Sequence, residues 1–266
     1  MGIAYNPKVV TDGLVHLLEA SKANGTTTQS ISNPISGSSW TANNFSVGNS
    51  ANLSTFLSNT NSTGAGTSYL RVTPNSDLTT GSITFIIWFN LKGIALNVGS
   101  NNNWRGLLCT NTGGTSGSPL TMVLEQGSVI NFSTTHTDSY RRFLNNSFTP
   151  ITADANGWQM VAYTYDQSSG NAACYKNDFL ILSGPMTTNT SGGSPTTAGR
   201  ALSYTNYTSG GTETGFRIYG GTNTGTNPSG NGMVPGEVSN IMIYNRALSE
   251  AEIQANFNAL RGRFGI

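Results

Sequence analysis

The segment GSITFIIWFNLKG, residues 81–93, constrains the fold more than any other part of the chain. Successive side chains of a β-strand point to opposite faces, so every second residue shares a face. One face of this segment is wholly apolar and consists of Ile83, Phe85, Ile87, Phe89 and Leu91; the other is mixed and consists of Thr84, Ile86, Trp88 and Asn90. The pattern predicts a central strand. We expect its apolar face in the core of a β-sandwich and its mixed face on a half-covered concave surface.

Other short apolar runs, bounded by turn residues, predict further antiparallel strands. They cover residues 14–20, 68–74, 104–111, 119–127, 128–135, 215–221 and 236–245, and residues 157–184 predict three consecutive strands. A segment rich in Gly, Ser, Thr and Pro, 184–214, predicts a surface loop. Because no repeat or linker interrupts this pattern, residues 1–266 are expected to form a single domain.

The C-terminal end predicts a helix at about residues 250–261. Ser249 and Glu252 have the spacing of a capping box, and Leu248 and Ile253 have that of a hydrophobic staple. Glycine often follows the last turn of a helix, so we expect this one to end at Gly262. Its apolar stripe, which includes Ile253, predicts packing against the edge of the sandwich.

Composition argues against several classes of partner. Only 9% of the residues are charged and the net charge is +1, which gives no electrostatic case for binding nucleic acid or an anionic membrane. The sequence has no apolar run long enough to span a bilayer and no signal-peptide pattern at its start, so we expect neither membrane insertion nor export. Cys109 and Cys174 both lie in apolar strand-like runs, which favours buried free thiols over a disulfide.

Three segments in order, GSITFIIWFNL, GWQMVAYTYDQSSGNAACYKND and GEVSNIMIYNRALSEAEI, resemble the concanavalin A-like, laminin G-like domains. The resemblance rests on Trp88, on the Gly157-Trp158 and Tyr165-Asp166 pairs, and on the closing run from Ile243 to Ser249. It implies an all-β, two-sheet antiparallel jelly-roll sandwich with a short C-terminal helix. The opening YNPKVVTDGLVHLLEAS is similar to stand-alone versions of this domain in structural proteins of tailed phages, particularly marine ones.

Some enzymes share this fold, but the sequence shows no catalytic constellation. Retaining glycosidases need two carboxyl groups about 5–5.5 Å apart. Glu250 and Glu252 are the only two of the 12 acidic residues within five positions of each other, and the start of the helix explains both. His16 is expected to be packed within a strand, and His136 has neither a nucleophile elbow nor a second partner. We therefore predict a protein that is not an enzyme.

Two kinds of binding site are considered. Aromatic side chains on a concave sheet stack on sugar rings, and the candidates are Trp88, Trp104, Tyr140, Tyr204 and Tyr207. Core packing is the alternative for each, and Tyr204 and Tyr207 are also placed to contact a partner subunit. Oxygen ligands for Ca²⁺, the one cofactor considered, are available at Asp77, Asp166 and Asp178, each of which is also explained as a turn residue.

The leading hypothesis is a non-enzymatic structural protein of a phage virion, made in the host cytoplasm and located at the capsid surface or the tail. Such a protein works by assembly, so the expected partners are other virion proteins and further copies of this chain. The second hypothesis is a carbohydrate-binding module that recognises host surface glycans. An exposed aromatic pair on the concave sheet would favour the second hypothesis over the first.

Overall fold

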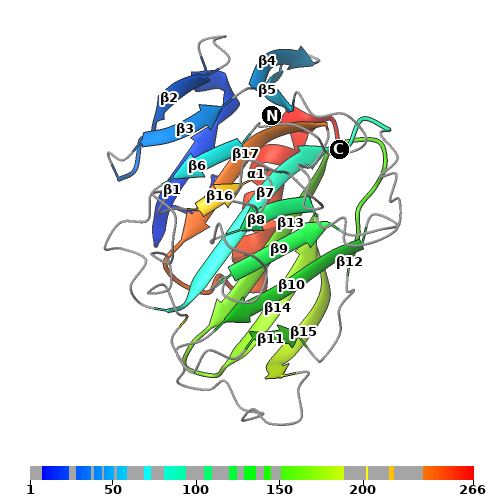
Figure 1. Ribbon diagram of the computed structural model, residues 1–266. Helices are drawn as coiled ribbons and strands as arrows, with labels where there is room; N and C mark the ends of the chain where they lie inside the picture. Colours follow the sequence, from blue (N-terminus) through cyan, green and yellow to red (C-terminus); the bar gives the residue numbers. More distant parts are fainter. Residues whose placement is uncertain are drawn as a thin grey trace, which may run out of the picture.

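Figure 1 shows a computed structural model of the chain as a ribbon. The structure describes residues 8–23, 28–36, 39–43, 45–50, 53–58, 69–72, 81–93, 105–109, 120–124, 129–135, 141–144, 151–188, 202, 216–218 and 236–266. Within these residues the chain forms two antiparallel sheets, a short 3-10 helix η1 (Ala20–Lys22) and the C-terminal helix α1 (Glu250–Phe264). None of the helices in these ranges is long and apolar enough to cross a membrane.

Sheet A holds the longest runs of buried strand residues. Its neighbouring strands are, in order, β15 (Phe179–Thr188), β14 (Asn171–Lys176), β13 (Gln159–Asp166), β7 (Ile83–Asn90), β17 (Glu237–Tyr244) and β1 (Leu14–Glu19). A hairpin of β4 (Phe45–Ser50) and β5 (Leu53–Ser58) pairs with the start of β17. Strands from near both ends of the chain, β1 and β17, are therefore direct neighbours.

Sheet B lies against sheet A. Its strands are, in order, β2 (Thr28–Ser32), β3 (Ser39–Asn43), β6 (Tyr69–Val72), β16 (Phe216–Ile218), β8 (Arg105–Cys109), β9 (Leu120–Leu124) and β10 (Val129–Thr135). Strands β11 (Arg141–Leu144) and β12 (Ile151–Thr152) pair with the two ends of β10. Strand β15 also pairs with β11, so it links the two sheets. This arrangement confirms the predicted concanavalin A-like β-sandwich.

Each strand predicted from apolar alternation has a counterpart in the structure, but the polar part of the chain contains strands that the pattern does not indicate. Strands β2, β3, β4 and β5 are rich in Ser, Thr and Asn, and so is the stretch of the sequence around them. Such strands contribute few apolar residues to a core and leave a weak periodic signal. Strand β15 also runs on to Thr188, so it includes residues 184–188 of the predicted 184–214 loop; apart from Leu202, the rest of that loop lies outside the described residues.

The core between the sheets is built from alternate residues of the strands. Phe85 and Ile87 of β7 are buried there together with Trp40 of β3. Across the interface Phe132 of β10 stacks on Tyr163 of β13, with ring centroids 5.1 Å apart. Burial of this many large side chains is the main stabilising contribution to the fold.

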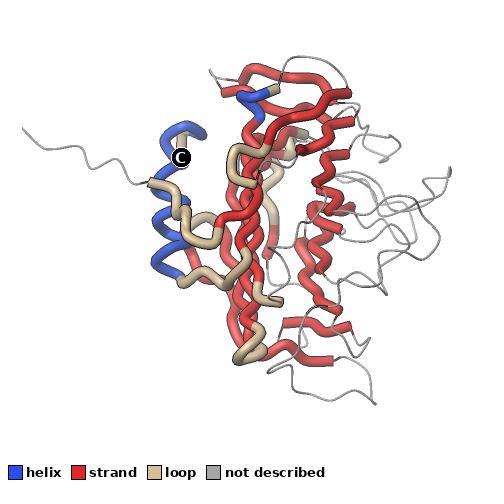
Figure 2. Tube along the Cα trace, turned by 90° about the vertical axis from the view of Figure 1, so that its left-hand side faces the viewer, coloured by secondary structure: helices blue, strands red, loops and turns tan. Residues whose placement is uncertain are grey.

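A second apolar layer lies on the other face of sheet A, where α1 packs (Figure 2). Trp88 is fully buried there, and the ring of Phe264 stacks on it at a centroid distance of 4.2 Å and an interplanar angle of 9°. Phe257 stacks on the same indole at 5.6 Å. The prediction that this face of residues 81–93 lines a concave surface is therefore wrong, because α1 covers it.

Helix α1 begins as predicted and ends later than predicted. Ser249 accepts a hydrogen bond from the backbone N–H of Glu252, and the Glu252 carboxylate accepts one from the Ser249 N–H, which confirms the capping box. The predicted end at Gly262 is wrong: the helix continues to Phe264, and Gly265 takes the left-handed conformation at φ 73°. The extra turn places Phe264 on Trp88, a gain that offsets the low helix propensity of a glycine at position 262.

We expect Phe264→Ala to destabilise the protein by about 3 kcal/mol, since it removes a buried ring and leaves a cavity over Trp88. The measurement is the free energy of unfolding in urea. Asn258→Ala, an exposed position on the same helix, is the matched control and should change stability by less than about 0.5 kcal/mol. Equal stability of the two variants would contradict the covering role of α1.

Candidate functional site

A polar cluster at the start of α1 joins three parts of the chain. Arg246 donates two hydrogen bonds to the Glu252 carboxylate, at 3.0 and 2.6 Å, and a third to the backbone carbonyl of Asp12. Thr84 of β7 donates its hydroxyl to the Arg246 carbonyl and accepts the N–H of Leu248. This Arg246 latch joins the N-terminal segment, β7 and α1. The hydrogen bonds from Arg246 lower the pKa of Glu252 to about 2, so its carboxylate is engaged structurally.

A second, buried network ties the same elements together. Tyr244 donates its hydroxyl to the Val10 carbonyl at 3.0 Å, and Asn256 donates its side-chain amide to the Tyr244 oxygen at 3.0 Å. The Asn256 oxygen accepts the N–H of Val10 at 2.8 Å. Burial raises the pKa of the Tyr244 hydroxyl well above its ordinary value. Its role is that of a fixed hydrogen-bond donor between α1 and the N-terminal segment.

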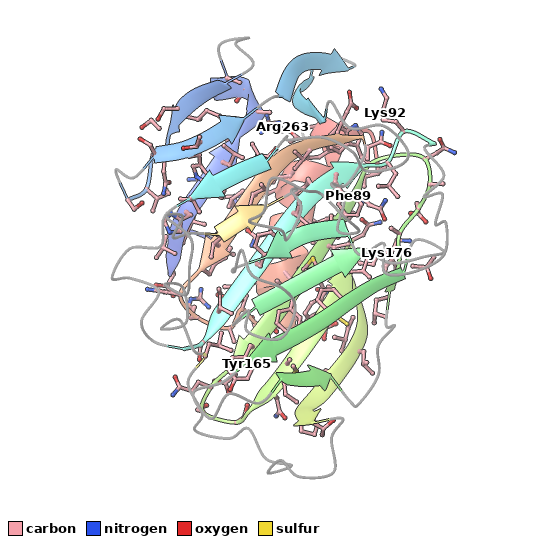
Figure 3. The ribbon with its side chains drawn as sticks, viewed as in Figure 1. Phe89, Lys92, Tyr165, Lys176 and Arg263 are labelled. Atoms are coloured by element: carbon pink, nitrogen blue, oxygen red, sulfur yellow. The ribbon has the colours of Figure 1, made fainter. Side chains whose placement is uncertain are left out.

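Most other described carboxylates also have a structural partner. Ion pairs join Glu19 to Arg263, Asp154 to Lys176 and Glu237 to Lys92, at 3.5, 2.7 and 3.5 Å. Lys92 and Lys176 are labelled in Figure 3. Within the described ranges no group of three or more His, Cys, Asp or Glu side chains is placed to hold a metal ion.

The predicted calcium ligands do not converge where the structure describes them. The Asp166 carboxylate accepts hydrogen bonds from the hydroxyls of Ser168 and Ser169, at 2.8 and 2.6 Å, in the turn after β13. Partial burial raises the pKa of Asp166, but the hydrogen bonds outweigh this effect, so the pKa lies below its ordinary value. Asp178 lies in the turn at the other end of β14, a strand of six residues or about 20 Å, so the two residues cannot bind the same ion. Asp77 lies outside the described residues.

Of the five predicted sugar-stacking residues, the structure describes only Trp88. Trp88 is enclosed between sheet A and α1, which supports its alternative as a core residue. It is not available for stacking on a sugar, because Phe257 and Phe264 cover its ring. Trp104, Tyr140, Tyr204, Tyr207 and also His136 lie outside the described residues.

The remaining candidates of the sequence have structural roles. His16 is fully buried, as expected; its Nδ1 lies 2.9 Å from the Asn33 amide nitrogen, and its ring meets Trp40 edge-on. Cys174 is a buried free thiol whose pKa burial raises to about 12, so it is an inert core residue. The side chain of Cys109 is not among those described.

The outer face of sheet B is different, because no described element lies over it (Figure 2). Residues directly opposite each other in neighbouring antiparallel strands share a face of the sheet. One such row crosses the whole of sheet B, and we call it the outer row: Ser30, Thr41, Arg71, Arg217, Cys109, Thr121, Ser133 and Phe143. Leu70 and Val72, on either side of Arg71 in β6, are fully buried in the core. The outer row therefore belongs to the face of sheet B that is turned away from the core.

The charged residues are divided between the two sheets. The strands of sheet B carry no acidic residue and five arginines, at positions 71, 105, 141, 142 and 217. The strands of sheet A carry three acidic residues, Glu19, Asp166 and Glu237, and one lysine, Lys176, a formal charge of −2. Because the chain as a whole is only +1, this concentration of arginine is specific to sheet B. The register divides these arginines between the faces of the sheet. Arg105 is opposite Leu124, which is opposite the buried Ile130, and Arg142 is opposite the buried Thr134, so both take the core side.

Arg71 and Arg217 form the centre of the outer row and stand directly opposite each other in strands β6 and β16. Sequence reasoning missed both, since each is a single arginine in a short apolar run of a weakly charged chain. An arginine within YLRV or GFRI was the available signal, but the sequence does not show that the two are neighbours.

Comparison with known proteins agrees with this architecture. The family model of the concanavalin A-like lectin/glucanases superfamily matches residues 62–224. The chain belongs to this superfamily. No curated protein matches the sequence.

Solved structures show the same sandwich within larger proteins. Trypanosoma rangeli sialidase in complex with sialic acid has a TM-score of 0.60 and 15% identity, covering 95% of this chain and 34% of the sialidase. The botulinum neurotoxin serotype D/C binding domain has a TM-score of 0.57 and 14% identity, covering 93% of this chain and 52% of that one. The binding domain of botulinum neurotoxin DC in complex with SialylT is similar at a TM-score of 0.55 and 14% identity, covering 94% and 52%. The chain thus spans about a third to a half of the length of these structures, and the likeness concerns the fold.

The Arg246 latch predicts a pH dependence of stability. The folded-state pKa of Glu252 is lowered from its ordinary 4.5 to about 2, so its stabilising contribution is present above pH 4.5 and is lost as the pH falls towards 2. We expect Glu252→Gln to melt well below the wild type at pH 7, and the gap in melting temperature to shrink between pH 4.5 and 2. Glu250→Gln, which leaves the contact with Arg246 intact, is the control with a much smaller gap; an equal gap for both variants would refute the assignment.

Proposed function

We propose that this chain is a non-catalytic, glycan-binding domain that uses the outer face of sheet B. The observation that supports the proposal is the coverage of sheet A on both sides, by sheet B and by α1, whereas no described element covers the outer face of sheet B. The outer row offers the hydroxyl-bearing residues Ser30 and Thr41, which suit the hydroxyl groups of sugars. Two of the similar structures, a sialidase and a neurotoxin binding domain, are complexes with sialic acid and with SialylT, which supports the same ligand class.

The aromatic candidates fit this placement in the sequence. Trp104 and Tyr140 directly precede β8 and β11, two strands of sheet B, so each is next to the proposed binding face along the chain. Stacking of a sugar on either ring would add to the hydrogen bonds from the outer row. We further propose that residues 1–266 act as one domain, supported by the pairing of β1 with β17, and that binding needs no metal cofactor.

The full chain is expected to bind a subset of glycans on an array. Thr41→Trp, which places a bulky residue in the outer row, should abolish binding, and Asn258→Trp, at an exposed position on α1, should leave it unchanged. Binding should also persist in EDTA. Loss of binding with the α1 variant alone would place the site elsewhere, and loss in EDTA would restore the calcium hypothesis with Asp77 or Asp178 as ligands.

A second function, assembly into a phage virion, is favoured by a separate observation. Phe179, Leu180 and Ile181 at the start of β15 are 69%, 40% and 41% exposed, an unusual concentration of apolar surface on one strand. Such a strand is suited to contact with another subunit. Under this proposal the domain is a capsid-surface or tail component that contacts further virion proteins or copies of itself, and glycan recognition is the task of the assembled particle.

Assembly through β15 predicts a mass larger than one chain in light scattering at rising concentration. Phe179→Asp combined with Ile181→Asp should reduce this mass to that of the monomer, whereas Ser21→Asp, an exposed polar position, should leave it unchanged. Subunit identification by electron microscopy of the source particle is the decisive measurement, and absence of the chain from any particle would end the virion proposal.

A further inference from the structure

We infer that His16 and Asn33 form an acid-sensitive clasp, which releases the β2–β3 hairpin from strand β1 when the His16 ring takes up a proton. The hairpin belongs to sheet B and β1 to sheet A, so the clasp joins the two sheets at one edge of the sandwich. This device goes beyond the proposed glycan binding and does not depend on it.

Asn33 lies in the turn between β2 and β3, and its side chain binds the backbone of β1. The Asn33 oxygen accepts the N–H of Leu17 at 3.2 Å, and the Asn33 amide nitrogen donates to the Val15 carbonyl at 3.0 Å. The amide thus bonds to β1 in the way that a residue of a neighbouring strand would. The same oxygen accepts the N–H of Ile35 at 3.1 Å, and the same nitrogen lies 2.6 Å from the Ser36 hydroxyl, so the turn is fixed to β1.

These contacts decide which form of the His16 ring fits. Backbone N–H groups only donate, so the Asn33 oxygen has to face Leu17 and Ile35, and its NH2 group is left on the side of His16. The nitrogen of that group lies 2.9 Å from Nδ1 of His16. Because an amide NH2 group only donates, Nδ1 has to be an acceptor. It is one only when it carries no proton, which is the case in a neutral ring with its proton on Nε2.

A protonated ring would place two hydrogen-bond donors against each other inside the protein. His16 and Asn33 are 0% and 1% exposed, so the two donors cannot turn to water while the clasp is closed. Burial by itself also disfavours a charged ring. Uptake of a proton therefore favours a state in which Asn33 has moved away from His16 and β1.

The groups that face the His16 ring are neutral. Ile243 is opposite His16 in β17, and Trp40 of β3 meets the ring edge-on at a centroid distance of 6.2 Å. Residues 23–70, which include the whole hairpin, contain no Asp, Glu, Lys or Arg. Glu19 of β1 is paired with an arginine of α1, and the one acidic residue of β17 is its first, six positions before Ile243, and is paired with a lysine.

The direction of the pH effect follows from the neutral ring. A histidine of the unfolded chain takes up a proton near about pH 6.5. Below that pH the unfolded chain binds more protons than the folded one, so stability falls as the pH falls, by up to about tenfold in the ratio of folded to unfolded protein per pH unit. This range lies above the one in which Glu252 titrates, which separates the two effects.

The test is unfolding of the full chain in urea at pH 7 and pH 5. We expect the wild type to lose about tenfold or more in the ratio of folded to unfolded protein. His16→Asn, whose side-chain oxygen can accept from Asn33 and does not titrate, should lose much less. Asn33→Asp, which offers an acceptor to a protonated ring, should reverse the trend. His136→Asn removes the only other histidine of the sequence and is the control, with the pH dependence of the wild type.

Hydrogen exchange shows whether the change occurs at the clasp. The N–H groups of Leu17 and Ile35 should lose protection at pH 5, after correction for the intrinsic exchange rates. The N–H of Met160, which is donated to the side chain of Asn177 in a similar way, should keep its protection. Equal stability of the wild type at the two pH values, or an equal fall in His16→Asn, would overturn the inference. So would unchanged protection of Leu17 and Ile35, because the proton would then act elsewhere.

Discussion

The contact between Trp88 and the rings of Phe257 and Phe264 is the interaction on which the rest of the structure depends. Trp88 lies on the face of β7 that is turned away from the inter-sheet core, and without α1 this face would expose a large apolar surface to water. With α1 in place, the central strands of sheet A are buried on both faces. The protein is thus a three-layer structure of helix, sheet A and sheet B.

The coverage of sheet A also determines what its neighbouring polar and charged groups do. The charged groups near α1 serve its attachment: Arg246 binds Glu252 and the N-terminal segment, and Asn256 joins Tyr244 to Val10. Each of these groups is hydrogen-bonded to a partner within the protein. Sheet B, in contrast, has arginines without acidic residues in its strands, and it is the sheet over which no described element packs.

Sequence reasoning succeeded where burial imposes a period on the residues. The alternation in residues 81–93 and the capping box at Ser249 and Glu252 each report a local requirement, and both correspond to elements of the structure. It failed where the requirement is not local. The polar strands β2 to β5 have little periodicity of their own, and the helix passes Gly262 because Phe264 has a distant partner in Trp88. Trp88 was a candidate for sugar stacking with core packing as its alternative, and the structure supports core packing, because the distant helix α1 covers the ring.

The sequence by itself determined the sandwich class, the start of the closing helix and the buried state of His16 and Cys174, because apolar period and capping act over a few residues. Only the tertiary structure decided which face of sheet A the helix covers and which residues meet across sheet B. Arg71 and Arg217 become neighbours through the pairing of β6 with β16, strands that lie far apart along the chain. Strand order and register depend on the packing of the whole core, so no local pattern at either arginine reveals the other.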